Sequence, residues 1–246
     1  MEQKQFQAES KRMLDLMIHS IYTHKEIFLR EIISNASDAI DKMNYKAIGD
    51  SSIAVSAADL KIDIKVDKEA RTITISDNGI GMTEEEVDRY INQIAFSSAG
   101  EFLEKYKDQL SSIIGHFGLG FYSAFMVADK VTIETLSWKE GAKAMKWTCD
   151  GSPEYEMKEC KKADRGTVIT LYIADDEKEY AEKNRISGLL NKYCKFMPVP
   201  VVFGKEQEWK DGKYVDTDKD NVINKVEPLW ARKPADLKDE DYKEFY

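Results

Sequence analysis

Cysteine is scarce in this chain of 246 residues, which contains only three. Cys149, Cys160 and Cys194 are far apart, form no C-x-x-C pair and have no histidine nearby. The sequence therefore indicates neither a zinc site nor a disulfide framework. This use of cysteine favours a reducing compartment.

Long hydrophobic runs and blocks of like charge are also missing. No stretch approaches the roughly 20 apolar residues that a membrane-spanning helix needs. The first residues, MEQKQFQAES, contain no apolar signal core, so we expect a cytoplasmic protein without a membrane partner. The net charge is −9, from 36 basic and 45 acidic residues, which argues against a nucleic-acid-binding surface on this chain.

Histidine is equally rare, with three residues in the whole chain. His19, His24 and His116 stand in no phosphoacceptor motif, and no two of them have metal-ligand spacing with acidic partners. We interpret them as solvated or capping residues. Histidine kinase chemistry and a histidine metal centre are therefore not predicted.

The stretch from Glu26 to Met43 has the clearest pattern in the chain. It predicts an amphipathic helix, because at 3.6 residues per turn its apolar residues gather on one face. A polar stripe follows the edge of that face at spacings of four, three and four residues: Glu31, Asn35, Asp38 and Lys42. Such a stripe can be a plain helix boundary, and Lys42 receives no role. The other polar residues should point toward water: Arg30, Ser34, Ser37 and Asp41.

Alternation of apolar and charged residues predicts two strands after this helix. Leu60–Asp67 alternates strictly, and Arg71–Ser76 alternates again after a charged turn, so the two should form an antiparallel hairpin. Helices are also expected at residues 10–22 and 177–196, and strands at 131–138, 144–149, 167–173 and 199–203. The chain is therefore predicted to be an α+β two-layer sandwich, with helices on one face of a mixed, mostly antiparallel sheet.

Two glycine motifs interrupt this pattern. The first is D-x-G-x-G, in which Asp77 ends a predicted strand and Gly79 and Gly81 follow it. Glycine at these positions permits a positive φ and a close approach of the backbone to a ligand. A capping box, Thr83–Glu86, then begins a helix.

The second motif is G-x-x-G-x-G, formed by Gly115, Gly118 and Gly120 before an expected helix. Glycines that enter a helix make an anion site from backbone N–H groups. Phe121 and Tyr122 stand where a Walker A loop needs lysine and serine or threonine, so this is not a P-loop. The dinucleotide-binding fingerprint fails as well, because its third glycine is missing.

With the polar stripe E-x-x-x-N-x-x-D, these motifs resemble the ATP-binding (Bergerat) fold of the gyrase, heat-shock chaperone, histidine kinase and MutL superfamily. The residues around these motifs resemble the sequences of the heat-shock protein 90 family of the bacterial HtpG type: IFLREIISNASDAIDK, ISDNGIGMT, GHFGLGFYSAFMVADKV and DRGT. The resemblance covers about residues 6–203, and LWARK with the terminal YKEFY resembles the passage into that family's middle domain.

The resemblance implies a base site around Asp77. A buried carboxylate there can accept a hydrogen bond from the exocyclic amine of adenine, whereas guanine presents a carbonyl at the same place and is rejected. Gly79, Gly81 and Met82 should line the base, and Thr167 matches the family's threonine that shares a water with the aspartate. In isolation, Asp77 could equally be a turn residue at a strand end.

The polar stripe on the helix should serve the phosphates. Glu31 would face the γ-phosphate and orient or deprotonate the attacking water. Asn35 offers an amide oxygen to Mg²⁺, an ion that usually keeps several waters and shares phosphate oxygens. Asp38 would bind waters near the sugar or base, with a structural role as the alternative.

The segment from Met82 to Gly120 lies between the glycine motifs and is placed to act as a lid. Nucleotide contacts are expected from Asn92, Gly118, Leu119, Gly120 and Phe121, although Phe121 could also be a core residue. The sequence departs from the family pattern here: Asn92 replaces a hinge glycine, and Phe96 replaces a lysine that contacts phosphate.

The resemblance implies that the full-length protein is a chaperone that binds and hydrolyses ATP with Mg²⁺ and acts on unfolded client proteins. Residues 1–203 would be its N-terminal ATP-binding domain, 204–230 a charged linker and 231–246 the truncated start of a middle domain. The fragment should be mainly monomeric, whereas the full-length protein would be a homodimer. The alternative is a DNA-repair or topoisomerase ATPase of the same superfamily. A third hypothesis is a nucleotide sensor in which Glu31 is incidental.

Overall fold

A computed structural model describes residues 24–49, 56–92, 120–152, 154–210 and 212–224. The helix expected at residues 10–22 lies outside this part of the chain. So do most of the expected lid and two of its predicted site residues, Gly118 and Leu119, together with Gly115 of the second glycine motif. The domain boundary expected at residue 230 lies outside it as well.

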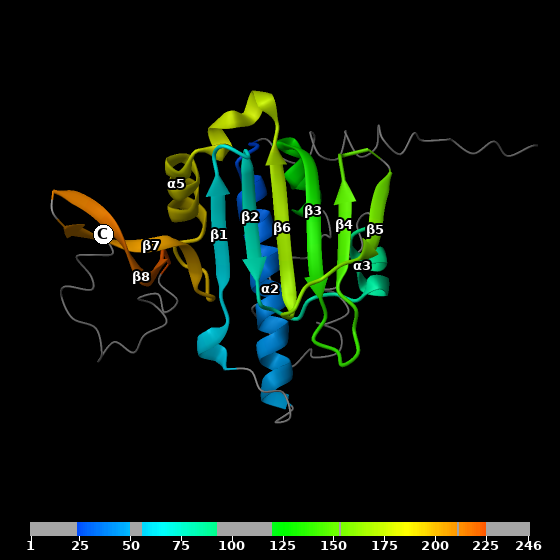
Figure 1. The fold of residues 1–246 in the computed structure, drawn as a ribbon. Coiled ribbons are helices and arrows are strands. Elements are labelled where there is room, and N and C mark those ends of the chain that lie inside the picture. The colour runs from blue at the N-terminus through cyan, green and yellow to red at the C-terminus, as the bar shows by residue number, and fades with distance from the viewer. Residues whose placement is uncertain (1–23, 50–55, 93–119, 153, 211, 225–246) are drawn as a thin grey trace, which may run out of the picture.

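Among the described residues, eight strands form one sheet in the order β5-β4-β3-β6-β2-β1-β7-β8 (Figure 1). Their bounds are β1 Ile62–Asp67, β2 Thr72–Asp77, β3 Ala128–Leu136, β4 Met145–Cys149, β5 Tyr155–Glu159, β6 Gly166–Ile173, β7 Val201–Lys210 and β8 Lys213–Val222. The β1–β7 pair is parallel. The other six pairs in this order are antiparallel, so the predicted mixed, mostly antiparallel sheet is confirmed.

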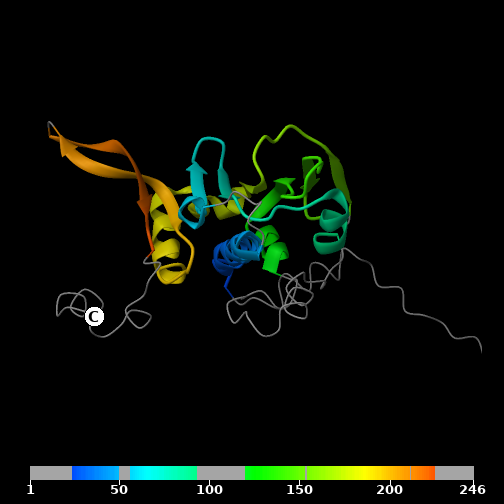
Figure 2. The same ribbon diagram turned by 90° about the horizontal axis from the view of Figure 1, so that it is seen from below.

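The α-helices lie on one face of this sheet, as the view along its strands shows (Figure 2). The α-helices are α2 Ile27–Gly49, α3 Glu84–Tyr90 and α5 Lys183–Tyr193. The 3₁₀ helices are η1 Ala57–Asp59, η2 Gly120–Met126 and η3 Asp175–Ala181. The predicted two-layer α+β sandwich is therefore confirmed. None of the helices in the described ranges combines the length and the apolar character needed to span a bilayer.

Helix α2 lies at the centre of the helical layer and is buried more widely than its sequence suggests. Phe28 is fully buried and meets the Tyr180 ring edge-on, with ring centroids 5.3 Å apart. The expectation that Ser34 and Ser37 point toward water is wrong, because both are buried. The physical reason is that α2 contacts η2 and α5 as well as β1 and β2, so its buried arc is wider than one apolar face. Arg30 is exposed, as predicted.

The helix predicted at residues 177–196 is interrupted in the structure. The η3 helix ends at Ala181, and Glu182 has an extended backbone (φ −93°, ψ 125°) before α5 begins. Ile186, Leu189 and Leu190 are buried as their spacing indicates. The interruption leaves the predicted apolar positions buried, because both short helices pack their apolar residues against the same core.

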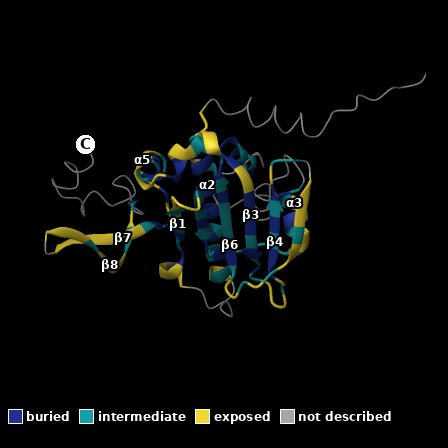
Figure 3. Cartoon of the chain, turned by 45° about the horizontal axis from the view of Figure 1, so that its top comes forward, coloured by how far each residue is buried: buried dark blue, intermediate teal, exposed yellow. Residues whose placement is uncertain are grey.

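Residues 204–221 differ most from expectation, because the structure places them largely in strands. β7 continues to Lys210, and β8 pairs with it as the outer strand of the sheet. Most of their side chains are exposed, including Trp209 and Tyr214, as the yellow hairpin in Figure 3 shows. A hairpin that is solvated on both faces lacks the apolar alternation by which a strand is recognised.

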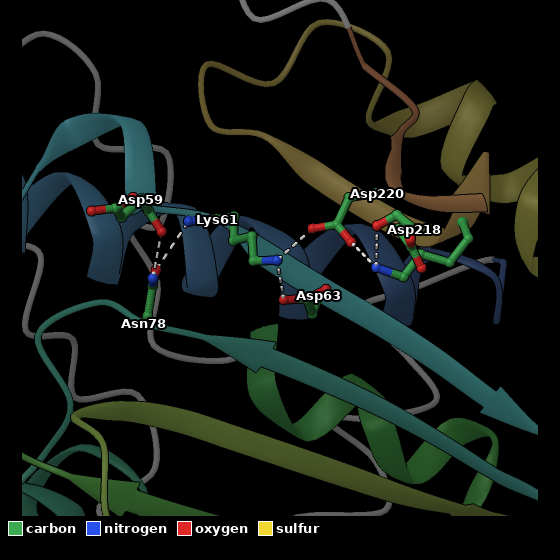
Figure 4. Close-up of polar contacts among 7 residues, drawn as sticks. Asp59, Lys61, Asp63, Asn78, Asp218 and Asp220 are labelled. Carbon is green, nitrogen blue, oxygen red and sulfur yellow. Dashed lines mark hydrogen bonds and ion pairs between the residues drawn. The ribbon is translucent and has the colours of Figure 1, made fainter.

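An ion-pair network attaches this hairpin to the body of the sheet (Figure 4). Lys61 on the chain entering β1 places its Nζ 2.6 Å from Asp220 Oδ2 and 3.2 Å from Asp63 Oδ2. Lys205 Nζ lies 2.8 Å from the other oxygen of Asp220. The backbone N–H of Lys61 donates to Asn78 Oδ1 at 2.9 Å, so the network reaches the loop after β2.

Candidate functional site

Asp77 ends strand β2 and faces the helical layer. Its side chain is buried, and its Oδ1 accepts a hydrogen bond from the Gly79 N–H at 2.9 Å. Burial raises the pKa of this carboxyl from 3.8 to about 7, because removal from water penalises the charged form; backbone hydrogen bonds from Gly79 and Thr167 act in the opposite direction. Because this pKa is close to neutral pH, the Asp77 carboxyl can ionise there and accept a hydrogen bond from a donor on a ligand.

A row of three polar residues crosses the sheet at this point. Thr167 on β6 is the direct partner of Asp77 on β2 and of Thr135 on β3. The two threonine hydroxyls lie 3.0 Å apart, and both residues are buried. Thr135 was not among the residues predicted from the sequence. Thr135 lies 32 residues before Thr167 and belongs to no sequence motif. Only the register of β3 against β6 could have indicated that Thr135 is part of the site.

The D-x-G-x-G loop fits tightly between α2 and β3. A Cβ on Gly79 would lie 2.6 Å from the Ala39 carbonyl carbon, and the next residue, Ile80, donates its N–H to Ala39 O at 3.0 Å. Gly81 has φ +62°, and a Cβ there would lie 1.9 Å from the Leu136 carbonyl oxygen. Both positions thus exclude a side chain, as the motif predicted. The capping box that follows, Thr83–Glu86, is also present.

Glu31 lies at the other end of the polar stripe, beside the second glycine motif. A Cβ on Gly120 would lie 2.8 Å from Glu31 Oε2. The other oxygen, Oε1, accepts a hydrogen bond from Arg30 at 2.7 Å. Eight residues separate Glu31 from Ala39, which corresponds to about 12 Å along a helix. The site therefore has two ends along α2, which we call poles. One pole is formed by Glu31 and Gly120, and the other by Asp77 and Gly79.

The other stripe residues differ in exposure. Asn35 is exposed, whereas Asp38 and Lys42 are buried. Burial lowers the pKa of Lys42, against the raising effect of the Asp38 and Glu86 carboxylates. Asp41 has its pKa raised to about 6, mainly by burial and next by the nearby charge of Asp38. The stripe thus has an accessible amide, Asn35, followed by two buried charged groups, Asp38 and Lys42.

Three further predicted residues make contacts within the protein. Phe121 is buried and meets the Trp147 ring at 5.5 Å between centroids, edge to face. Asn92 donates to Asp88 Oδ1 at 2.8 Å and accepts from Trp147 Nε1 at 2.9 Å. Met82 is half-buried, and its N–H donates to the Thr135 hydroxyl at 2.9 Å. Their contacts with a nucleotide remain predictions.

No cluster of three or more histidine, cysteine or carboxylate side chains suited to a metal occurs in the described ranges. The exposed Asn35 amide fits a way of binding Mg²⁺ in which one protein oxygen is combined with phosphate oxygens and water.

Comparison with known families identifies the class of protein. The family described as histidine kinase-, DNA gyrase B- and HSP90-like ATPase matches residues 22–167, which include both glycine motifs and Thr167. The match covers more than half of the chain. The chain therefore belongs to this ATPase family.

Individual relatives share a more particular name. The chain is 60% identical over 227 residues to Chaperone protein HtpG of Porphyromonas gingivalis, covering 92% of this chain and 33% of the relative. It is 61% identical over 226 residues to the Bacteroides fragilis protein of that name, with the same coverage. The Idiomarina loihiensis protein is 44% identical over 258 residues, which cover 100% of this chain and 40% of the relative. The chain thus spans about a third of the length of the first two.

Proposed function

We propose that this chain is the ATP-binding and ATP-hydrolysing domain of an HtpG-type chaperone. The observation that carries the proposal is the separation of two chemically different poles along α2. Asp77 with Thr167 supplies buried polar groups at one pole, and Glu31 beside Gly120 supplies a carboxylate at the other. A nucleotide has the same polarity, with a hydrogen-bonding base at one end and phosphates at the other.

At the base pole, ionised Asp77 would accept a hydrogen bond from the exocyclic amine of adenine. Guanine places a carbonyl oxygen there, which would leave the buried carboxylate facing a second acceptor. Gly79 and Gly81 let the loop pack closely against α2 and β3, which would hold its backbone beside the base.

At the phosphate pole, Glu31 would orient water for hydrolysis. The water oxygen attacks the γ-phosphorus while the bond to the β–γ bridging oxygen breaks, and Glu31 accepts the proton that the water loses. Asn35 would supply one oxygen to Mg²⁺, which neutralises charge on the phosphates when it is bound. Gly118, Leu119 and Gly120 would contribute backbone N–H groups, and Phe121 and Asn92 contacts from the lid side.

The activity of the whole protein is part of the same proposal. Its HtpG relatives are about three times as long as this chain, so client binding, homodimer formation and the clamp cycle would need segments outside it. We expect the fragment to be mainly monomeric, to hydrolyse ATP slowly and to act in the cytoplasm. The DNA-repair or topoisomerase alternative is not favoured, because the relatives are named chaperones and the chain carries a net charge of −9.

Titration calorimetry with ATP and ADP in the presence of Mg²⁺ tests the proposal. Asp77→Asn keeps the size of the side chain but removes its charge and should abolish binding. Glu31→Ala should retain binding and, in the full-length protein, lose hydrolysis. Hydrolysis that survives in full-length Glu31→Ala would instead support a nucleotide sensor, and failure of the wild-type chain to bind either nucleotide would refute the proposal.

A further inference from the structure

The hydroxyl of Thr135 joins the D-x-G-x-G loop to the opposite side of the base pole. It is almost fully buried, at 1% exposure. Its Oγ1 accepts a hydrogen bond from the Met82 N–H at 2.9 Å and lies 3.0 Å from Thr167 Oγ1. The Thr135 hydroxyl can also donate to the carbonyl oxygen of Gly166, 3.4 Å away. Thr135 belongs to neither glycine motif nor to the polar stripe on α2.

The number of protons limits how these groups can be arranged. A threonine hydroxyl has one proton to donate and two lone pairs to accept with. The Met82 N–H occupies one lone pair of Thr135, so its single proton goes either to Thr167 or to Gly166. The bond to Gly166 is the longer and weaker one, and either hydroxyl can be the donor in the 3.0 Å contact with Thr167. Two arrangements therefore satisfy these contacts: Thr135 donates to Gly166 and accepts from Thr167, or Thr135 donates to Thr167.

The second arrangement determines what Thr167 can offer to a ligand. When Thr167 accepts from Thr135, its own proton is free to point toward the site that it shares with its strand partner Asp77. The site then presents an acceptor, the Asp77 carboxylate, beside a donor, the Thr167 hydroxyl. Adenine has the complementary pair on one edge, the exocyclic amine as donor and ring nitrogen N1 as acceptor. Guanine has both groups reversed.

We propose that Thr135 is a positioning residue for base recognition, and that its hydroxyl orients Thr167 as a hydrogen-bond donor toward adenine N1, directly or through one water. The inference rests on the proposed function, since it concerns how the same site reads its nucleotide. The Met82 amide contributes to this role, because it occupies one lone pair of Thr135 and so limits the directions in which that hydroxyl can donate.

The test compares ADP with 1-deaza-ADP, in which a C–H group replaces N1, by titration calorimetry. The wild-type chain should bind ADP about tenfold more tightly than the analogue, the value of one hydrogen bond of ordinary strength. Thr135→Val keeps the side-chain shape but removes the hydroxyl, and the preference should fall to about twofold or less. Thr135→Ser should restore it, because serine returns the hydroxyl to the same position.

Thr132→Val is the matched control, a buried threonine of the same strand outside this chain of hydroxyls, and it should keep the wild-type preference. Should Thr135→Val not fold, Thr135→Ala is measured in its place, with a melting curve for each free variant. A variant that weakens both ligands by the same factor, or neither, overturns the proposal, since a purely structural role would not distinguish N1 from C–H. If the wild-type chain binds neither ligand, the proposed ATP site itself is wrong.

Discussion

Gly120 is packed against Glu31 so closely that a methyl group has no room: a Cβ added at Gly120 would lie 2.8 Å from Glu31 Oε2 and 3.3 Å from Glu31 Cβ. The last glycine of the second motif therefore borders the carboxylate proposed as the catalytic base. This contact connects two motifs that are 89 residues apart, from Glu31 to Gly120.

Gly120→Ala should reduce hydrolysis more than binding. The added methyl group displaces the end of the Glu31 side chain, and a displacement of about 1 Å at a catalytic group can cost up to about 100-fold in rate. We expect the ATPase rate of the full-length protein to fall at least tenfold, while the Kd for ADP changes by less than about threefold. Steady-state phosphate release and calorimetry would measure the two, and an unchanged rate would show that Glu31 tolerates the shift.

Gly79→Ala should destabilise the fold and abolish nucleotide binding. Its Cβ would lie 2.6 to 2.8 Å from backbone atoms of Ala39 and Ile40, which cannot move without separating the loop from α2. We expect a loss of about 2–4 kcal/mol in the free energy of unfolding, measured by urea denaturation. Gly188→Ala on α5 is the matched control, because nothing lies within 4 Å of its Cβ, and alanine there should add up to about 1 kcal/mol.

Binding of the adenine base should depend on pH through Asp77. The unfolded carboxyl ionises near 3.8, whereas the folded one holds its proton until about pH 7. The folded state therefore binds more protons in this window, so its stability falls as the pH rises from about 4 to 7. The affinity for a donor should move the other way, increasing up to about tenfold per pH unit below 7 and levelling off above it.

Adenosine is the suitable ligand for this measurement, because it carries no phosphate that titrates near pH 6. Calorimetry in two buffers with different ionisation heats should detect release of up to one proton per adenosine bound below pH 7. An affinity that is flat between pH 5.5 and 8 would mean that Asp77 is already ionised in the free protein.

Glu26 should stabilise the fold by holding the start of α2 to α5. Hydrogen bonds from Lys192 and then Tyr193 are the main causes that lower its pKa from 4.5 to about 2. Because Lys192 is largely exposed, we expect Glu26→Gln to cost about 1–2 kcal/mol at pH 7, less than the full shift would suggest. This contribution is present above pH 4.5 and is lost as the pH falls through 4.5 toward 2.

Urea denaturation of Glu26→Gln at pH 7 and at pH 3 would measure this contribution, with Glu208→Gln on the exposed hairpin as the control. The difference between Glu26→Gln and wild type should shrink at the lower pH. An equal difference at both values would assign the effect to packing instead of charge.

The β7–β8 hairpin should depend on Asp220 for its attachment to β1. Asp220 accepts from Lys205 and Lys61, and Asp220→Asn removes the charge that both lysines share. Amide hydrogen exchange should become faster in β7, β8 and the start of β1. Asp216→Asn near the hairpin tip, where Asp216 contacts Gln207, should leave exchange at β1 unchanged. Equal exchange at β1 in both variants would show that backbone pairing alone holds the hairpin.

Much of the fold and part of the site follow from local rules that the sequence expresses directly. Alternation at Leu60–Asp67 predicts a strand whatever lies around it, and Thr83 with Glu86 caps its own helix. The D-x-G-x-G motif is equally local, because the positive φ at Gly81 favours glycine before any neighbour is considered. For these features, the residue types and their spacing were sufficient.

Other features depend on which segments meet, and no spacing in the sequence encodes that. Ser34 and Ser37 are buried because α2 is enclosed by several elements, and the polar hairpin joins the sheet by backbone pairing, not by apolar side chains. Thr135 comes to face Thr167 only through strand register. The sequence by itself determined the motifs and the class of fold, since both arise from short-range patterns. Only the tertiary structure decided how a hydroxyl on β3 and a glycine on η2 meet the residues that those motifs name.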